Sequence, residues 1–272
     1  MFARVMLGFG LLSAPLHAQS YAAFGSRPQL DVVVPVFSDQ DVGALLSTLD
    51  RTLAAGASSA GSSERAGDVL WQFARRMQAG RLSRAQEFRV LAHLDRIAAA
   101  RAGGAALIAG PRRMISHLSV GKPAPEIAGR DLDGKPFRLS DYRNKVVVLV
   151  FTAEWCGICR AQAPYERFLL DRYARWPFAL LAVDTGSSRE AAKRAQAQNP
   201  VAHRSWWDES RTDGRGGSIA SAWNVVGWPA TYVVDGDGII QFVDLREEDL
   251  LKAVRGLVET QADRDEKAQR AR

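Results

Sequence analysis

Cys156 and Cys159 stand three positions apart in the run Trp-Cys-Gly-Ile-Cys-Arg that begins at Trp155, and they are the only 2 cysteines in the sequence. The run Val146 to Thr152 before them is apolar and rich in β-branched residues, as in a buried parallel strand. The run Arg160 to Arg175 after them has the composition of a helix. A cysteine pair at such a strand-to-helix junction can form and break a disulfide, so the spacing predicts thiol–disulfide chemistry.

The predicted helix gives the two cysteines different roles. Residues three apart on a helix lie about 5–6 Å from each other, which is within reach of a disulfide. The first cysteine falls where unpaired backbone N–H groups and the helix dipole stabilise a thiolate, the attacking species. We therefore expect Cys156 to be the nucleophile and Cys159 the resolving thiol of a redox-active disulfide.

Two other uses of a Cys-x-x-Cys pair fit the sequence less well. A structural zinc ion needs four protein ligands, whereas the 4 histidines, His17, His93, His117 and His203, show no ligand spacing. A structural disulfide that closes so short a loop restrains little of the unfolded chain. We predict no metal site and no bound cofactor, because the electrons move between thiols.

The composition is that of a globular chain with a dispersed positive charge. Apolar residues make up 47% of the sequence, which is enough for a sizeable core in one or two domains. The net charge of +6 comes from arginines spread along the chain, with no dense basic block that interleaves aromatic residues. Nucleic-acid binding is therefore not expected.

Residues 1–18 have the pattern of a cleaved export signal. Arg4 supplies a positive start, Val5 to Leu16 supplies an apolar stretch, and Leu16-His17-Ala18 supplies a cleavage site. The stretch is too short to span a bilayer comfortably, and an ordinary apolar helix is the alternative interpretation. The pattern predicts a periplasmic or otherwise exported protein, with no stable membrane insertion after signal removal, in an oxidising compartment where a spare thiol would be a liability.

Residues 30–115 are predicted to form a small all-α module of unknown role. Ser38 to Asp41 is a helix start that leads into Val42 to Ala55, and Ser83 to Gln86 is a second such start. Between them, Gly56 to Gly67 has the composition of a flexible connection. Nothing in the module has a catalytic pattern, so we expect its apolar faces to pack on one another or on a partner.

From residue 118 onward, the pattern changes to strands that alternate with helices. Besides the strand before the cysteines, extended runs are expected at Phe178 to Asp184, Thr231 to Val234 and Ile239 to Val243. Asp131 to Phe137 is expected to form a hairpin around Asp133-Gly134. These elements predict an α/β fold with a mixed central sheet flanked by helices over residues 118–260, closed by a helix at Glu247 to Thr260. The charged end, residues 261–272, is predicted to be disordered.

Four blocks of this region resemble a known family. They are V-G-K-P-A-P-E-I from Val120, D-L-D-G-K-P-F-R-L-S-D-Y from Asp131, V-V-V-L-V-F-T-A-E-W-C-G-I-C-R from Val146 and W-N-V-V-G-W-P-A-T-Y-V-V-D-G-D-G-I-I from Trp223. In this order they are similar to the redoxin and TlpA-like thiol–disulfide oxidoreductases of the AhpC/TSA–thioredoxin superfamily. The resemblance covers residues 118–259 and implies a thioredoxin-like fold there, but it does not reach the helical module.

The family implies a cis-proline opposite the cysteine pair, and Pro229 is the matching residue. A cis peptide bond at this position leaves the backbone of Trp228 free to pair with a client strand beside Cys156. The alternative is that Pro229 merely begins a strand. Trp155 is expected to shield the disulfide and to line the client groove, so Trp155, Trp228 and Pro229 are the predicted substrate-binding residues.

Several positions depart from the family pattern. Ile158 replaces the proline usual between the cysteines, and Trp228 is bulkier than the residues often found before the cis-proline. Relatives often carry a glutamate three residues after the second cysteine, where this chain has Gln162, which cannot exchange a proton. If a carboxylate assists Cys159, Glu154 is the nearest in sequence. Glu154 and Gln162 are therefore the predicted supporting residues.

The cysteine pair and the resemblance together predict an exported thiol–disulfide oxidoreductase that acts on protein thiols and disulfides. An upstream dithiol partner must then reset it. One alternative is a thiol peroxidase of AhpC/TSA type, but Leu149 and Ala153 stand where its Pro-x-x-x-Thr-x-x-Cys motif needs proline and threonine. The other alternative is a redox-sensing, partner-binding protein that docks through the helical module.

Overall fold

The computed structural model describes residues 32–55, 62–198, 201, 203–209 and 216–270. The chain separates into two units, Met1–Asp31 and Val32–Arg272, and all the helices and strands described belong to the second unit. The predicted export signal, residues 1–18, lies outside the described residues.

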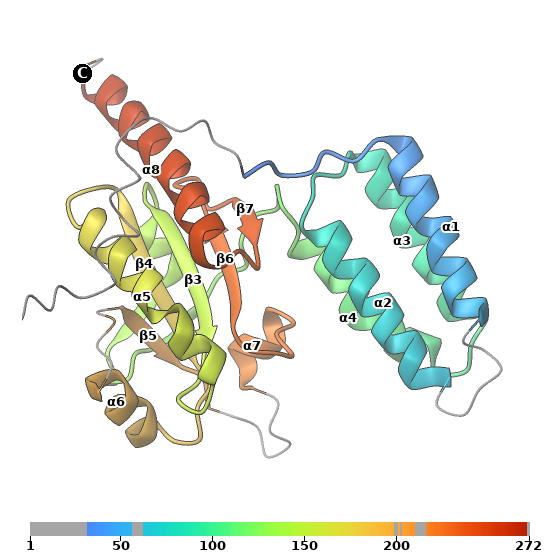
Figure 1. The fold of residues 1–272 in the computed structure, drawn as a ribbon, viewed down its shortest axis with the longest axis horizontal. Coiled ribbons are helices and arrows are strands. Elements are labelled where there is room, and N and C mark those ends of the chain that lie inside the picture. Colours follow the sequence, from blue (N-terminus) through green and yellow to red (C-terminus); the bar gives the residue numbers. More distant parts are fainter. Residues whose placement is uncertain (1–31, 56–61, 199–200, 202, 210–215, 271–272) are drawn as a thin grey trace, which may run out of the picture. The chain divides into compact units, whose positions relative to one another are not determined.

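Four helices form the predicted all-α module (Figure 1): α1 (Asp39–Ala55), α2 (Ser62–Gln78), α3 (Arg84–Ala99) and α4 (Gly104–His117). Their apolar faces share one core, to which Val42, Leu70, Leu94 and Ile115 contribute. The predicted helix start at Ser83 is confirmed: its hydroxyl accepts a hydrogen bond from the Gln86 N–H, and the Gln86 side chain accepts one from the Ser83 N–H.

Helix α4 was not expected from the sequence, because its glycines and its internal Pro111 lower helix propensity. Gly103, just before it, adopts a left-handed conformation with φ of 70°. A Cβ on Gly104 would lie 2.1 Å from the carbonyl oxygen of Ala98, so this glycine permits the close return of the chain against α3. Burial of Ile108 and Met114 in the shared core then stabilises the helix despite its composition.

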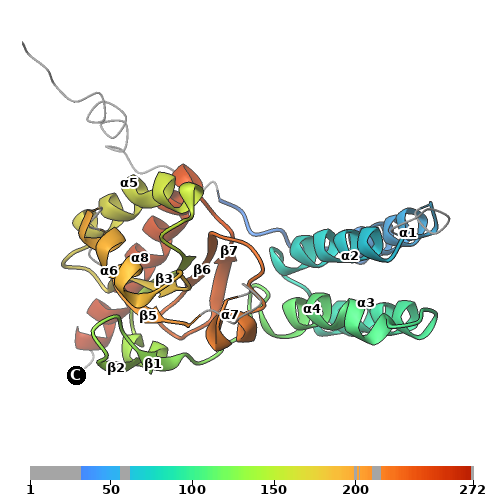
Figure 2. The same cartoon turned by 90° about the horizontal axis from the view of Figure 1, so that it is seen from below.

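A five-stranded mixed sheet of order β5-β4-β3-β6-β7 forms the rest of the unit (Figures 1 and 2). The strands are β3 (Val146–Thr152), β4 (Phe178–Asp184), β5 (Arg204–Trp207), β6 (Ala230–Val234) and β7 (Ile240–Val243). β3 pairs in parallel with β4, and β4 in parallel with β5, whereas β6 runs antiparallel to both β3 and β7. The helices are α5 (Gly157–Arg172), α6 (Arg189–Gln198), α7 (Ser218–Ala222) and α8 (Glu247–Arg270). The predicted mixed sheet flanked by helices is confirmed.

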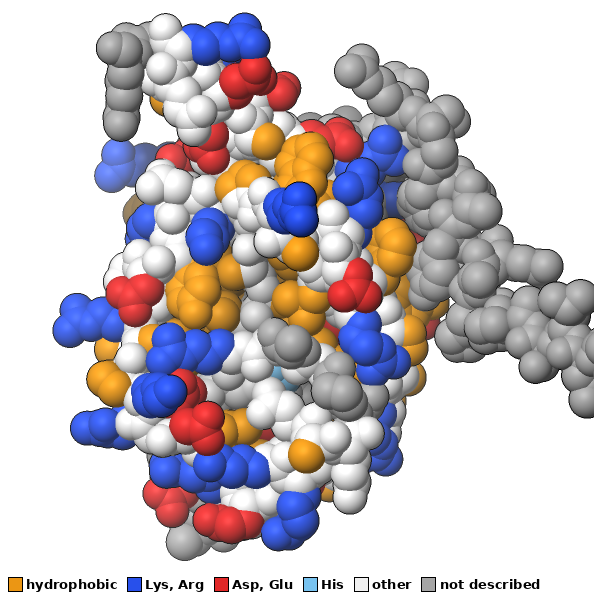
Figure 3. Space-filling view, turned by 90° about the vertical axis from the view of Figure 1, so that its left-hand side faces the viewer, with side chains coloured by type: hydrophobic (Ala, Val, Ile, Leu, Met, Phe, Trp, Pro, Cys, Tyr) orange, Lys and Arg blue, Asp and Glu red, His pale blue; other side chains and the backbone are white. Residues whose placement is uncertain are grey.

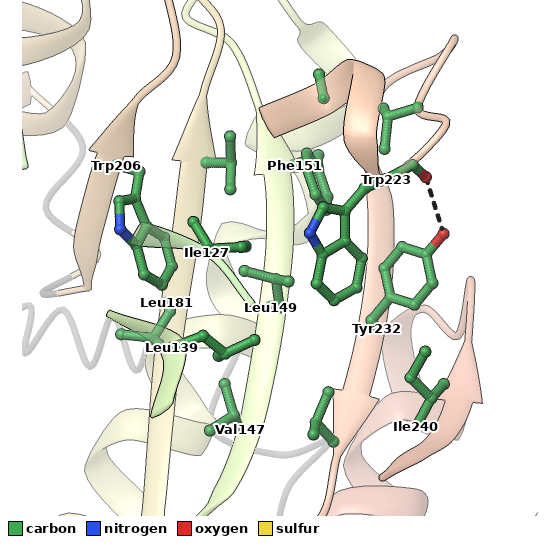
Figure 4. Close-up of a cluster of buried hydrophobic side chains, with 14 of the residues drawn as sticks. Ile127, Leu139, Val147, Leu149, Phe151, Leu181, Trp206, Trp223, Tyr232 and Ile240 are labelled. Carbon is green, nitrogen blue, oxygen red and sulfur yellow. Dashed lines mark hydrogen bonds between the residues drawn. The ribbon is translucent and has the colours of Figure 1, made fainter. Parts of the chain in front are cut away.

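Strand β3 alternates its side chains between two cores, as strand geometry requires. One face packs with α5 and α8, and its members are Val146, Val148 and Val150. The other face joins a core rich in aromatic rings, and its members are Val147, Leu149 and Phe151 (Figure 4). Because both faces are buried, the strand is apolar throughout, and this makes it recognisable in the sequence.

The aromatic core explains two elements that the sequence did not predict. β5 brings in Trp206, whose ring stacks on Phe137 with centroids 4.0 Å apart. Phe137 belongs to the predicted hairpin, formed by β1 (Ala128–Arg130) and β2 (Pro136–Arg138) and followed by the 3-10 helix η2 (Leu139–Tyr142). The short α7 is followed by Trp223, whose carbonyl oxygen accepts a hydrogen bond from the Tyr232 hydroxyl (Figure 4).

The prediction of a disordered end after residue 260 is wrong for residues 261–270, which continue α8. Gln261 is buried, and its amide donates a hydrogen bond to Asp265. Arg264 pairs with Asp237 at 3.1 Å. The charged residues lie on exposed parts of a helix whose first turns pack on the sheet, so their composition reflects solvent exposure rather than disorder.

The basic residues are dispersed on the face that Figure 3 shows. Lysine and arginine side chains there are interspersed with acidic and apolar ones. None of the described helices is both long enough and apolar enough to cross a membrane.

Candidate active site

The cysteine pair lies where β3 passes into α5. Cys156 is the N-cap residue of α5, with extended backbone angles, and Cys159 lies one turn inside the helix. The Cys159 N–H donates a hydrogen bond to the Cys156 sulfur at 3.1 Å. This donor and the helix N-terminus favour negative charge on Cys156 when the disulfide opens.

The two cysteines form a disulfide, with their Cα atoms 5.2 Å apart. Cys156 is 5% exposed and Cys159 8% exposed, and both pack with Ala153 and with the ring of Trp228. The neighbouring residues Trp155 and Ile158 are largely exposed and form an apolar rim beside the nearly buried cysteines. Exposed apolar surface of this kind is common at sites that bind another polypeptide.

The predicted cis peptide bond between Trp228 and Pro229 is confirmed. Pro229 is buried, and its carbonyl oxygen accepts a hydrogen bond from the Arg246 guanidinium at 3.0 Å. The Trp228 ring meets the Trp155 ring edge to face, with centroids 5.4 Å apart. The structure thus brings together the cysteine pair and the three residues expected to bind substrate.

The two predicted supporting residues, Gln162 and Glu154, make different hydrogen bonds. Gln162 is buried, and its side-chain oxygen accepts a hydrogen bond from the Glu247 N–H at the start of α8, so it fixes two helices to each other. Glu154 accepts hydrogen bonds from the backbone N–H and the hydroxyl of Ser187 through one carboxylate oxygen. Its other carboxylate oxygen is buried without a hydrogen-bond partner. Arg160 donates to the Glu154 carbonyl oxygen at 2.7 Å.

A cavity of about 90 Å³ borders Cys159, and three carboxylates line it: Glu154, Glu166 and Asp184. Burial raises the pKa of Glu166 to about 7. Burial also raises the pKa of Asp184 to about 6, and the negative charge of Glu154 adds to this effect while a hydrogen bond from the Gly186 N–H opposes it. The cavity therefore offers Cys159 carboxylates that exchange protons near neutral pH.

Glu166 and Asp184 were not predicted from the sequence, although signals for both exist. Glu166 lies seven residues after Cys159, which is two helical turns and thus the same face of α5. Asp184 ends β4, the parallel neighbour of β3, and the carboxyl ends of such strands meet at one edge of the sheet. Neither position follows from the family pattern, which places the carboxylate where this chain has Gln162.

Among the described residues, no group of three or more histidine, cysteine or acidic side chains could hold a metal ion. His203 lines the carboxylate cavity, and burial lowers its pKa, so the imidazole is neutral there.

Comparison with known proteins finds a family whose model matches the region that contains the cysteine pair. The AhpC/TSA family model matches residues 120–243. The thiol-disulfide oxidoreductase ResA of Geobacillus kaustophilus is 32% identical over 128 residues, which cover 46% of this chain and 68% of that protein. The chain belongs to the AhpC/TSA family. Within the AhpC/TSA family it resembles the redoxin-type thiol–disulfide oxidoreductases, and the matched residues contain both cysteines and Pro229.

Other relatives match similar lengths of this AhpC/TSA chain. The thioredoxin-like protein YneN of Bacillus subtilis is 31% identical over 124 residues, covering 46% of this chain and 70% of that protein. ResA of Bacillus thuringiensis subsp. konkukian is 29% identical, and the match spans 66% of its length, just under two thirds. Among solved structures, the thioredoxin domain of a thiol-disulfide oxidoreductase from Bacteroides vulgatus is 28% identical, with a TM-score of 0.47, covering 52% of this chain and 99% of that one.

Proposed function

We propose that this protein is an exported thiol–disulfide oxidoreductase that exchanges disulfides with protein substrates through Cys156 and Cys159. The observation that carries the proposal is the disulfide at the N-terminus of α5, with Trp228 packed directly against it. Its apolar rim suits a polypeptide client. Export is supported by the signal-like pattern of residues 1–18.

In the reducing direction, the Cys156 thiolate attacks one sulfur of a client disulfide. The client S–S bond breaks, one client thiolate leaves, and a mixed disulfide joins Cys156 to the client. Cys159 then attacks the Cys156 sulfur, which releases the second client thiolate and forms the Cys156–Cys159 disulfide. The client gains two electrons and the enzyme loses two. An upstream dithiol partner reverses this oxidation, and the same steps run backwards when the protein acts as an oxidant.

Cys159 must lose its proton before it can attack, and Glu166 is the proposed acceptor. It shares the small cavity with Cys159, and its pKa of about 7 leaves a substantial fraction ionised at neutral pH. A base with a pKa near the working pH is the most effective in proton transfer. Asp184 in the same cavity then gives the proton a second site on its way to solvent.

Trapping of the mixed disulfide tests the proposal. The Cys159→Ser variant should accumulate a covalent complex with a disulfide-containing protein such as insulin. Dithiothreitol should reduce the mixed disulfide and separate the two proteins. The Cys156→Ser variant should form no complex and should lose insulin reduction. Exchange by Cys156→Ser at the rate of the unaltered protein would overturn the proposal.

The peroxidase alternative is distinguished by the substrate of the reduced protein. Rapid consumption of hydrogen peroxide without insulin reduction would support a peroxidase, whereas insulin reduction with slow peroxide consumption supports disulfide exchange. The sensor alternative would be supported by a protein that cycles between its two redox forms without turning over any protein disulfide.

A further inference from the structure

A second cavity, of about 200 Å³, is lined by Trp228 and Pro229 and does not include the cysteines. Residues of the helical module line it together with the strand and loop residues around the cis-proline. Trp71, Arg75 and Met114 come from the module, and Trp228, Pro229 and Arg246 come from the sheet side. The module, to which the sequence assigns no role, thus forms part of the surface next to the active site.

Hydrogen bonds hold these walls in place. The Gln78 amide of α2 donates to the Leu118 carbonyl oxygen at 2.9 Å and to the Tyr232 hydroxyl at 3.2 Å, and all three groups are buried. Arg75 pairs with Asp244 at 2.6 Å. Because buried hydrogen bonds of this kind define a single geometry, the cavity is a preformed site.

The charged side chains of the cavity include one more cation than anion. Arg75 and Arg246 are always cationic, while Asp244 is the one acidic side chain that lines the cavity with them, and it already binds Arg75. Arg246 contacts a neutral carbonyl oxygen, and no ion pair is found for it among the described residues. This excess positive charge at Arg246 is complementary to a carboxylate.

We propose that this cavity receives a carboxylate side chain of the client, a glutamate or aspartate within a few residues of the client cysteine. This deepens the proposed function and rests on it. Trp228 connects the disulfide and the cavity, because it packs on the cysteines and also lines the cavity. A client bound along Trp228 therefore reaches both. Trp71 and Met114 supply apolar surface for the methylene groups of the acidic side chain. The helical module is then a specificity element of the enzyme.

The test uses the reduced full-length protein and decapeptides with one cysteine, blocked as an uncharged S-methyl disulfide. Glutamate, glutamine or lysine is placed in turn at each position up to three residues before or after the cysteine. At one or two positions the glutamate peptide should react about five- to tenfold faster than the lysine peptide, with glutamine between them. The difference should shrink in 1 M salt.

Two variants assign the effect to the cavity. In Arg246→Gln, which can still donate to the Pro229 carbonyl, the preference for glutamate should fall to less than twofold, and Trp71→Ala should slow the glutamate peptide several-fold. In each variant the glutamate rate is compared with the glutamine rate of the same variant, so a general loss of activity does not count as a loss of preference. Arg255→Gln, which removes a cation paired with Glu259 on α8, is the matched control and should keep the preference.

Equal rates for the three peptides at every position would overturn the proposal, as would a preference for lysine. It would also be overturned if Arg246→Gln and Trp71→Ala both kept the full preference. Failure of the protein to react with any of the peptides would instead overturn the proposed function, and this proposal with it.

Discussion

The two cysteines differ in how each is prepared to lose a proton. Cys156 has a backbone N–H and a helix N-terminus for its negative charge, which are fixed dipoles and need no titrating group. Cys159 lies inside the helix against a cavity with buried carboxylates. The first thiol is thus stabilised as an anion, whereas the second depends on a base.

The Glu166→Gln variant should therefore impair resolution but not attack. We expect release of the client from the mixed disulfide to slow at least tenfold at pH 7, because glutamine cannot accept the Cys159 proton. In the unaltered protein this rate should rise as the pH passes about 7, the pKa of Glu166, and the variant should lack that rise. Stopped-flow tryptophan fluorescence measures both steps, and Glu190→Gln, an exposed carboxylate on α6, is the control. An unchanged pH profile in Glu166→Gln would contradict the assignment.

Ionisation of Glu166 should also lower the free energy of unfolding at neutral pH. Its pKa rises from 4.5 to about 7 on folding, so between these values the unfolded chain releases a proton that the folded chain keeps. Stability then falls as the pH rises from about 4.5 to about 7, by about 3 kcal/mol in total. Glu166→Gln should be more stable than the parent by up to this amount at pH 8 and nearly equal at pH 4, as measured by denaturant unfolding of the oxidised forms. A constant difference at all pH values would show that ionisation of Glu166 is not its cause.

At the scale of elements, α8 shows how a charged segment is ordered by its neighbours. Its first turns bury Leu250, Val254 and Val258 against the sheet. Its last turns have a charged, exposed composition, yet they follow the same axis, and Gln261 is buried next to Gly236, where a Cβ would lie 2.3 Å from its side-chain oxygen. The helix therefore continues beyond the turns whose apolar residues pack on the sheet.

Truncation after Thr260 tests this extension. We expect the free energy of unfolding to fall by about 1–2 kcal/mol, since buried contacts of Gln261 and the Arg264–Asp237 pair are lost. Insulin reduction at low temperature should be unchanged, because the removed residues do not contact the active site. A matched truncation after Asp265, which keeps Gln261 and Arg264, should cost much less. Equal stability of both truncated forms and the full chain would indicate that the last turns add nothing.

At the scale of the whole described unit, the helical module and the sheet share a buried polar contact. Gln78 of α2 hydrogen-bonds Tyr232 of β6, and burial raises the pKa of Tyr232 far above its usual range. Polar groups placed there make the association of the two parts specific, because each loses a partner if they separate.

A double-mutant cycle should detect this contact. Gln78→Ala and Tyr232→Phe are each expected to destabilise the protein, with a coupling energy of about 1 kcal/mol between them. The exposed pair Lys193 and Asp133, replaced by alanines, is the control, for which coupling should be near zero. Urea unfolding of the four proteins in each cycle gives the energies. A coupling near zero for Gln78 and Tyr232 would mean that the contact does not join the two parts energetically.

The sequence predicted the features that local pattern specifies. β3 is recognisable because both of its faces are buried and its residues are therefore apolar. The hairpin is recognisable because its turn needs a residue with positive φ, which Gly134 supplies with φ of 83°. The helix start at Ser83 is recognisable because capping uses side chains that are close in the sequence. The cysteine pair belongs to this class, since three residues of helix suffice to bring the sulfurs together. Pro229 was found only through the family resemblance.

The remaining features depend on partners far apart in the chain. β5 is stabilised by the stacking of Trp206 on Phe137. Helix α4 forms despite its glycines because its apolar residues are buried in the core that it shares with α1, α2 and α3. The sequence shows Glu166 as one more charged residue of a helix, and only burial beside Cys159 gives it a pKa near 7. The charge pattern around Arg246 likewise exists only once the helical module meets the sheet. Local structure depends on residues that are close in the sequence. Burial, and the pKa shifts and charge interactions that follow from it, arise only when distant segments exclude water from one another.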